Sequence, residues 1–119
     1  MSRLNRGRIA GVAETVDEMI ADIIRREGGF VDRPEDHGGP TQFGITLKVA
    51  QKHGYPDVRL ITPSIAHDIM LTEYFVQPRL NRAPVELQPK LFDIAVNSGA
   101  PEAVKLLQRA LLTLGETIG

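Results

Sequence analysis

The feature that most constrains the fold is the stretch REGGFVDRPEDHGGPTQFGIT, residues 26–46, which is dense in glycine and proline and has no helical period. Segments with helical periodicity lie on both sides of it. Glycine and proline at this density interrupt helices and favour turns. We therefore expect a helical chain with one irregular insertion, in which Phe30–Val31 and residues 42–45 pair as a small hairpin around the loop from Pro34 to Gly39.

Apolar residues recur at helical spacing in five segments, which predicts a mainly α fold with one small β-hairpin after the first helix. Thr15 and Glu18 form a capping-box pattern at the start of the first segment. Thr62 followed by Pro63 marks the start of the third, which Pro78 ends. The five predicted helices span residues 16–27, 46–53, 63–77, 88–97 and 101–114.

Two of these helices carry apolar faces that we expect to be buried. The third has such a face at Ile65, Ala66, Ile69, Met70 and Tyr74. The last helix has a second one, and Gly115 is expected to end it. The apolar face of this last helix consists of Ala103, Leu106, Leu107, Ala110, Leu111 and Leu114.

Length and composition indicate one domain. The chain has 119 residues, of which 42% are hydrophobic, enough for one core and too few for two comfortable ones. It has no cysteine, so disulfides and thiolate metal sites are excluded and the fold depends on packing. We expect residues 1–13 to form a flexible N-terminal arm and residues 14–119 a single domain.

Several classes of partner are disfavoured by charge and hydropathy. Fourteen basic residues balance fifteen acidic ones, so nothing in the charge indicates nucleic acid. No window approaches the roughly 20 apolar residues that span a bilayer, so stable membrane insertion is not expected. Glu14 interrupts the apolar run after the N-terminal arginines, which makes an export signal unexpected.

Within the glycine-rich stretch, Glu27, Asp36 and Thr41 bring two carboxyl groups and a hydroxyl onto one short loop. Glu27 ends the first predicted helix, where the macrodipole's negative pole disfavours a charged carboxylate, and shielding by apolar neighbours would act in the same direction. Glycoside hydrolysis needs such a set, with one carboxyl that donates a proton and one ionised carboxylate. A divalent metal site at Asp32 to His37 is disfavoured because the calcium-loop spacing is missing, and no cofactor is expected.

The motif EGGFVDRPEDHGGPTQFGIT resembles the signature of glycoside hydrolase family 108, the N-acetylmuramidases found as phage endolysins and as bacterial "secretion activating" proteins. The segment FDIAVNSGAPEAVKLLQRAL, residues 92–111, is similar to the second half of the same family. Together the two matches and the helices between them cover roughly residues 16–114. The order of Glu, Asp and Thr is also similar to that of phage-type lysozymes.

The resemblance implies a lysozyme-like α+β fold and hydrolysis of the β-1,4 bond between N-acetylmuramic acid and N-acetylglucosamine in peptidoglycan. It implies Glu27 as the general acid, Asp36 as the second carboxylate and Thr41 as the residue that positions water, which favours inversion. The family normally continues with a segment thought to help hold peptidoglycan, whereas this sequence stops at LGETIG, which leaves two alternatives: a compact variant of the fold or a truncated chain. Such an enzyme would wait in the cytoplasm for a holin or travel in a phage-like particle.

Three further residues are candidates for substrate binding. Asp93 and Asn97 lie four apart on one helical face, where they could bind sugar groups or hold the structure together. Tyr74 could stack on a sugar or belong to the core. The alternative to an enzyme is a non-catalytic module that binds peptidoglycan or builds a phage particle.

Overall fold

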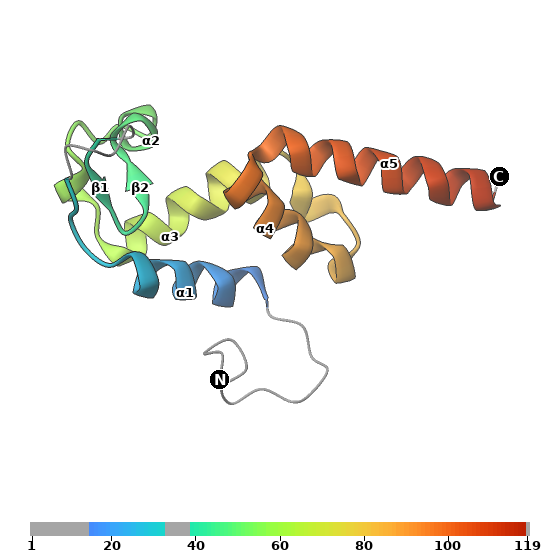
Figure 1. The fold of residues 1–119 in the computed structure, drawn as a ribbon, viewed down its shortest axis with the longest axis horizontal. Helices are drawn as coiled ribbons and strands as arrows, with labels where there is room; N and C mark the ends of the chain where they lie inside the picture. The colour runs from blue at the N-terminus through green and yellow to red at the C-terminus, as the bar shows by residue number, and fades with distance from the viewer. Residues whose placement is uncertain (1–14, 33–38, 119) are drawn as a thin grey trace.

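The computed structural model describes residues 15–32 and 39–118 (Figure 1). The described residues form a mainly helical molecule with one small antiparallel sheet, which confirms the predicted class. The predicted N-terminal arm and Asp36 lie outside the described residues, and the single-domain boundary stays a prediction. No helix among the residues described combines the length and the apolar character needed to cross a membrane.

Helix α1 (Val16–Glu27) has the predicted bounds. The Thr15 hydroxyl accepts a hydrogen bond from the Glu18 backbone N–H at 3.2 Å, and the Glu18 carboxylate accepts one from the Thr15 backbone N–H at 3.0 Å. Each bond satisfies a backbone donor that a helix start leaves open. At the other end the chain leaves the helix through Gly28 at φ +65°, a conformation that favours glycine.

The sheet consists of β1 (Thr41–Gln42) and β2 (Ile45–Thr46), paired Thr41 to Thr46 and Gln42 to Ile45. Phe43 at φ +51° and Gly44 at φ +84° form the two-residue turn between them. The predicted hairpin across the long loop was therefore wrong in its pairing, and only an antiparallel bridge between Val31 and Thr41 joins those segments. A two-residue turn brings strands together with less loss of chain entropy than closure of a long loop.

Of the next two helices, α2 (Leu47–Lys52) begins one residue after its predicted start and α3 (Pro63–Leu71) begins at its predicted residue. Thr46 caps α2 through the Val49 N–H, and Thr62 caps α3 through the Ile65 N–H. In both cases a threonine hydroxyl accepts one of the open N–H groups of the first turn. A short 3-10 turn at residues 58–60 lies between these two helices.

A π-helical turn (Thr72–Val76) extends α3, with a hydrogen bond from the Gln77 N–H to the Thr72 carbonyl at 2.9 Å. The wider turn shifts the buried face by one residue. Phe75 is consequently buried, and its ring meets that of Phe92 edge to face with centroids 6.3 Å apart. Tyr74, which the helical spacing placed in the buried face, is only partly buried.

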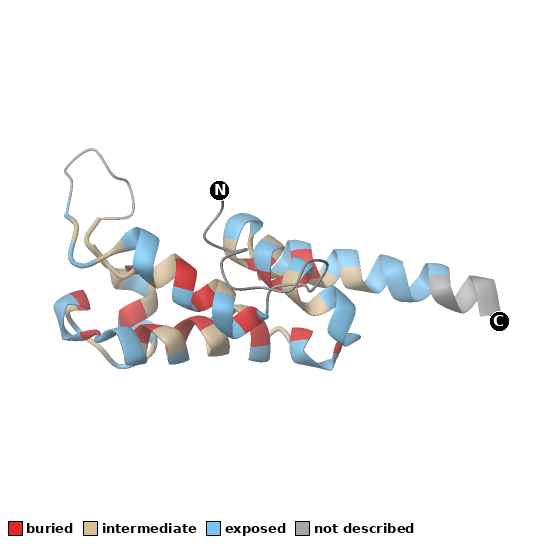
Figure 2. Ribbon diagram, turned by 90° about the horizontal axis from the view of Figure 1, so that it is seen from below, coloured by how far each residue is buried: buried red, intermediate tan, exposed pale blue. Residues whose placement is uncertain are grey.

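Two 3-10 turns at residues 80–82 and 85–87 lead into α4 (Gln88–Ser98), which ends at Gly99 with φ +100°. Helix α5 (Ala100–Ile118) follows directly. The helices α1, α3 and α4 pack around the core. In Figure 2 the buried residues lie in the body of the molecule, and the long C-terminal helix is mostly exposed. The largest fully buried side chains of this core are Ile20, Ile45, Val58, Ile61, Leu80 and Phe92.

Helix α5 differs from its prediction in two ways. It continues through Gly115 to Ile118, because one glycine costs a helix only about 1 kcal/mol and no proline follows it. Its predicted buried face is also mostly exposed: Ala103 is buried against α4, whereas Leu106 is 39% and Leu111 50% exposed. Figure 1 shows the reason, since α5 extends past the end of α4 and leaves the other helices behind.

A charged cluster ties α2 to the π-helical turn. Lys52 Nζ lies 2.8 Å and His53 Nε2 lies 2.9 Å from the two carboxylate oxygens of Glu73. Burial alone would raise the pKa of Glu73, but the hydrogen bonds from Lys52 and His53 outweigh it and hold that pKa below its ordinary value. The cluster therefore favours the ionised form of Glu73 in the folded protein.

We expect Glu73→Gln to destabilise the fold at neutral pH and to have little effect in acid. A carboxyl whose pKa is lower in the folded state stabilises the fold above its unfolded-state pKa and loses that contribution as the pH falls through the folded value. Urea unfolding should show a loss of about 1 kcal/mol at pH 7 that shrinks below about pH 4. Glu102→Gln, which removes an exposed pair with Lys105, is the control. A loss independent of pH would contradict this account.

Candidate active site

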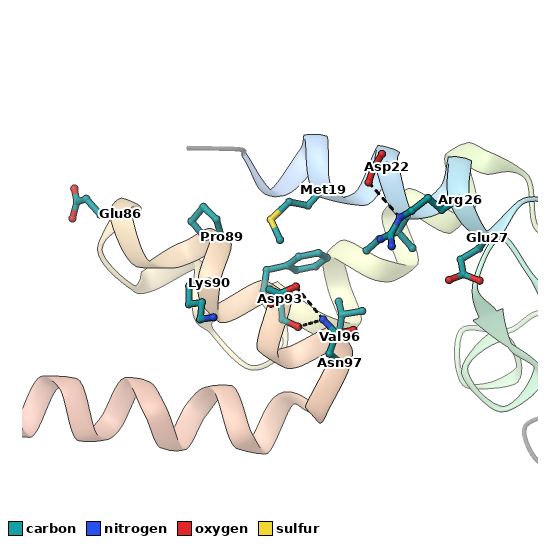
Figure 3. A pocket seen from close by; sticks show the side chains of 12 residues that line it. Met19, Asp22, Arg26, Glu27, Glu86, Pro89, Lys90, Asp93, Val96 and Asn97 are labelled. Carbon is teal, nitrogen blue, oxygen red and sulfur yellow. Dashed lines mark hydrogen bonds and ion pairs between the residues drawn. The ribbon is translucent and has the colours of Figure 1, made fainter. Parts of the chain in front are cut away.

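A groove of about 540 Å³ runs between α1 and α4 (Figure 3). One wall is a face of α1, and the other is a face of α4 together with Glu86 on the 3-10 turn before it. Most of the residues that line each helix face recur three or four positions apart. Glu27 lies at the end of the groove nearest the hairpin and Glu86 at the opposite end. The lining residues are Met19, Asp22, Ile23, Arg26 and Glu27 from the first wall, and Glu86, Pro89, Lys90, Phe92, Asp93, Val96 and Asn97 from the second.

Two contacts between α1 and the hairpin position Glu27. The Phe43 N–H donates to the Gly28 carbonyl at 2.8 Å, which holds the turn against the end of the helix. Gly44 lies so close that a Cβ built on it would be 3.2 Å from Glu27 Cγ. The stem of Glu27 therefore packs against the turn, and its carboxyl group faces the groove (Figure 3).

Apolar neighbours do not shield Glu27 from water, because the residue is exposed. Gly28 and Gly29 follow it and have no side chains to cover it. Within the described part of the chain no ion pair or side-chain hydrogen bond engages its carboxylate. The group is therefore free to meet a ligand that enters the groove.

Thr41 lies on β1, close in sequence to the turn that holds Glu27. Its backbone exchanges two hydrogen bonds with Val31, at 2.8 and 2.9 Å, and the residue is partly buried. It is not among the residues that line the groove. Its role in positioning water stays a prediction, as does that of Asp36, which the described residues do not include.

Asp93 and Asn97 lie on α4, in the wall opposite Glu27. The Asn97 amide nitrogen donates to the Asp93 carbonyl at 2.9 Å and to its carboxylate at 3.0 Å. The tie is thus within one helix rather than between helix and loop. It leaves the Asn97 side-chain oxygen and one Asp93 carboxylate oxygen without a protein partner among the described residues, so both can accept from a ligand.

Tyr74 does not line the groove. It lies on the π-helical turn and packs against the core, and burial, with a smaller contribution from the charge of Glu73, raises the pKa of its hydroxyl. Of the three residues predicted to bind substrate, the structure brings Asp93 and Asn97 to the groove with Glu27 and leaves Tyr74 apart.

Sequence reasoning missed two residues of the groove wall. Asp22 is a buried charged residue, 5% exposed, and ion pairs join it to Arg25 at 3.0 Å and to Arg26 at 3.3 Å. The signal that could have found this group is the spacing of an aspartate three and four positions before two arginines on a helix. Helical spacing alone would place Asp22 on the polar face of α1, whereas the structure places Asp22 and Arg26 in the groove.

The fold and the groove together have the organisation of a lysozyme-like α+β protein. Residues 20–99 match the family model described as glycosyl hydrolase 108, and this match covers well over half of the chain and all the residues that line the groove except Met19. The chain therefore belongs to the glycosyl hydrolase 108 family, as its motifs predict. No curated protein matched the chain.

Among solved structures, the chain is similar to that described as the structure of Brucella abortus SagA. The two are 32% identical in sequence and superpose with a TM-score of 0.64 over 77% of this chain. The match covers 56% of the SagA chain, so this chain spans little more than half the length of that protein. The likeness supports the lysozyme-like fold class.

We expect Gly44→Ala to displace Glu27 and Gly54→Ala to leave it in place. Both glycines have positive φ, +84° and +91°, so either change should cost about 1 to 2 kcal/mol of backbone strain. Only the Cβ at position 44 would touch Glu27, since nothing lies within 4 Å of one at position 54. Thermal unfolding should show similar losses, while the NMR signal of the Glu27 carboxyl carbon should shift in Gly44→Ala alone. Equal shifts in both variants would contradict the proposed contact.

Proposed function

We propose that the chain is a peptidoglycan hydrolase that cleaves the β-1,4 bond between N-acetylmuramic acid and N-acetylglucosamine, with Glu27 as general acid. The observation that carries the proposal is the Glu27 carboxyl, which is exposed and has no ion-pair partner among the described residues. It lies in a groove whose two walls come from the first and last parts of the region that matches the family. The groove has the volume of a small-molecule or oligosaccharide site. A glycan strand in it would place a glycosidic oxygen beside this carboxyl.

The proposed reaction begins when the Glu27 carboxyl donates its proton to the glycosidic oxygen of the leaving sugar. Thr41 would orient the water that attacks the anomeric carbon from the opposite face, and Asp36, as the second carboxylate, would accept the proton that this water gives up. Attack by water without a covalent intermediate inverts the configuration. Because the protein leaves Glu27 exposed, we infer that the bound glycan itself excludes water from the acid.

The α4 wall is proposed to bind the sugar rings. The free Asn97 and Asp93 oxygens would accept hydrogen bonds from sugar hydroxyl or acetamido N–H groups. The bonds between the two residues fix both side chains before substrate arrives, which lowers the entropy cost of binding. Because peptidoglycan lies outside the cytoplasmic membrane, we propose that a holin or a phage-like particle delivers the protein to it.

We expect Glu27→Gln to abolish clearing of purified peptidoglycan without loss of fold. Removal of a general acid typically lowers the rate by about 10²- to 10⁴-fold. Turbidity gives the rate, and borohydride reduction of the products followed by mass spectrometry identifies the sugar at the new reducing end, which should be muramic acid. Glu102→Gln, on α5 and outside the groove, is the matched control and should clear like the wild type.

Two outcomes would reject the hydrolase. Equal clearing by the wild type and Glu27→Gln would remove Glu27 from the chemistry. No clearing by either, with retained binding to peptidoglycan in a pull-down, would favour the alternative of a non-catalytic peptidoglycan-binding or phage-particle module.

The assignment of the two remaining acids gives a separate prediction. If Asp36 acts in catalysis and Asp93 in binding, Asp36→Asn should lower kcat with little change in KM, and Asp93→Asn should mainly raise KM. Steady-state kinetics on a soluble muramic oligosaccharide measures both constants. The reverse pattern would exchange the two roles and make Asp93 the second carboxylate.

A further inference from the structure

We propose that Arg26 is a specificity-determining residue that binds a carboxylate of the glycan next to Glu27, so that the groove prefers acidic strands to neutral ones. The role of Arg26 in glycan hydrolysis rests on the proposed function. The binding step stands on the geometry of Asp22, Arg25 and Arg26 and can be measured without turnover.

Asp22, Arg25 and Arg26 form a cluster on α1 in which two positive side chains share one negative side chain. Arg25 Nη2 lies 3.0 Å from one carboxylate oxygen of Asp22, and Arg26 Nε lies 3.3 Å from the other. Two guanidinium groups thus share a single buried carboxylate. The cluster has one more positive charge than negative, and it presents that charge at the surface of the helix.

The two arginines point to different places. Arg26 lines the groove and Arg25 does not. Figure 3 shows Arg26 directed from α1 towards Asp22, next to Glu27 at the hairpin end of the groove. Since its Nε engages Asp22, its two Nη groups have no ion-pair partner among the described residues. These N–H groups can donate a pair of parallel hydrogen bonds to a carboxylate.

The ion pair with Asp22 preorganises the Arg26 guanidinium for ligand binding. The Asp22 side chain is only 7% exposed and therefore has a fixed position. It restrains the guanidinium beside Glu27 and lowers the side-chain entropy that binding would cost. Asp22 is in this sense a positioning residue, and Arg26 is the group that contacts the ligand.

The other charges of the groove favour this location for an acidic group. Lys90 is the second cation in the lining, but it lies with Glu86 towards the far end, one helical turn from that opposite charge. Asp93 would repel a carboxylate bound near the middle of the groove. An acidic group is therefore best accommodated at Arg26, beside the bond to be cleaved.

In peptidoglycan this carboxylate has two possible sources. A muramic acid without a peptide has a free lactyl carboxylate, and a muramic acid with a peptide stem has carboxylates along the stem. Chitin oligosaccharides have the same backbone linkage and no carboxylate. Comparing the acidic ligands with chitin oligosaccharides separates the contribution of the carboxylate to binding from that of the sugar backbone. Comparing the two acidic ligands separates the lactyl carboxylate from the carboxylates of the stem.

Isothermal titration tests the proposal in the Glu27→Gln background, where the substitution prevents cleavage. The three ligands are a peptidoglycan tetrasaccharide without peptide, the same tetrasaccharide with its peptide stems, and tetra-N-acetylchitotetraose. Adding Arg26→Gln should weaken an acidic ligand about tenfold, the effect of a lost charge-assisted hydrogen-bond pair at a partly exposed site. Binding of chitotetraose should change less than about twofold, within measurement scatter for an uninvolved residue. Arg25→Gln is the matched control and should show no selective loss.

Selective loss with the peptide-free ligand assigns the lactyl carboxylate, and selective loss with the stem-bearing ligand alone assigns the peptide. Arg26→Lys keeps the charge without the planar donor pair, so it should lose part of the preference for acidic ligands over chitotetraose. The preference that remains should decrease as the salt concentration rises. Equal loss for chitotetraose, no loss beyond that of Arg25→Gln, or no binding of either acidic ligand overturns the proposal. Because every protein in the titration lacks the acid, absence of hydrolysis by the wild type would reject the proposed function and leave this result intact.

Discussion

The candidate site depends on one junction, where the end of α1 meets the turn of the hairpin. The Gly28 carbonyl accepts from the Phe43 N–H at 2.8 Å, and Gly44 packs against the stem of Glu27. A side chain on the last residue of a helix is otherwise poorly restrained. Here two glycines allow the backbone to turn and approach closely, so that a carboxyl group exposed to solvent still has a defined direction.

The groove arises from the same helical periodicity that builds the core. On α1, Ile20 is buried, whereas Met19, Ile23 and Glu27 lie on the adjoining face towards α4. A helix face has room for both a buried stripe and a lining stripe beside it. Asp22 is buried and also lines the groove, which explains how its carboxylate can restrain an arginine there.

The differences between prediction and structure have local physical causes. The π-helical turn at Thr72–Val76 places Phe75 rather than Tyr74 in the core, and a uniform helical period does not reveal such a turn. The apolar face of α5 is exposed because that helix outruns its neighbour, although its periodicity resembles that of a buried helix. Periodicity shows which residues share a face, whereas packing determines what covers it.

Local chemistry in the chain was sufficient to predict the helix starts at Thr15 and Thr62, the irregular insertion after α1 and the family motif around Glu27, because caps, turns and motifs involve residues near one another in sequence. The same information could not place Asp93 and Asn97 across a groove from Glu27, or show that Arg26 rather than Arg25 lines the groove between α1 and α4. Those relations join helices about 65 residues apart, and only the packing of α1 on α4 decides which of their faces meet.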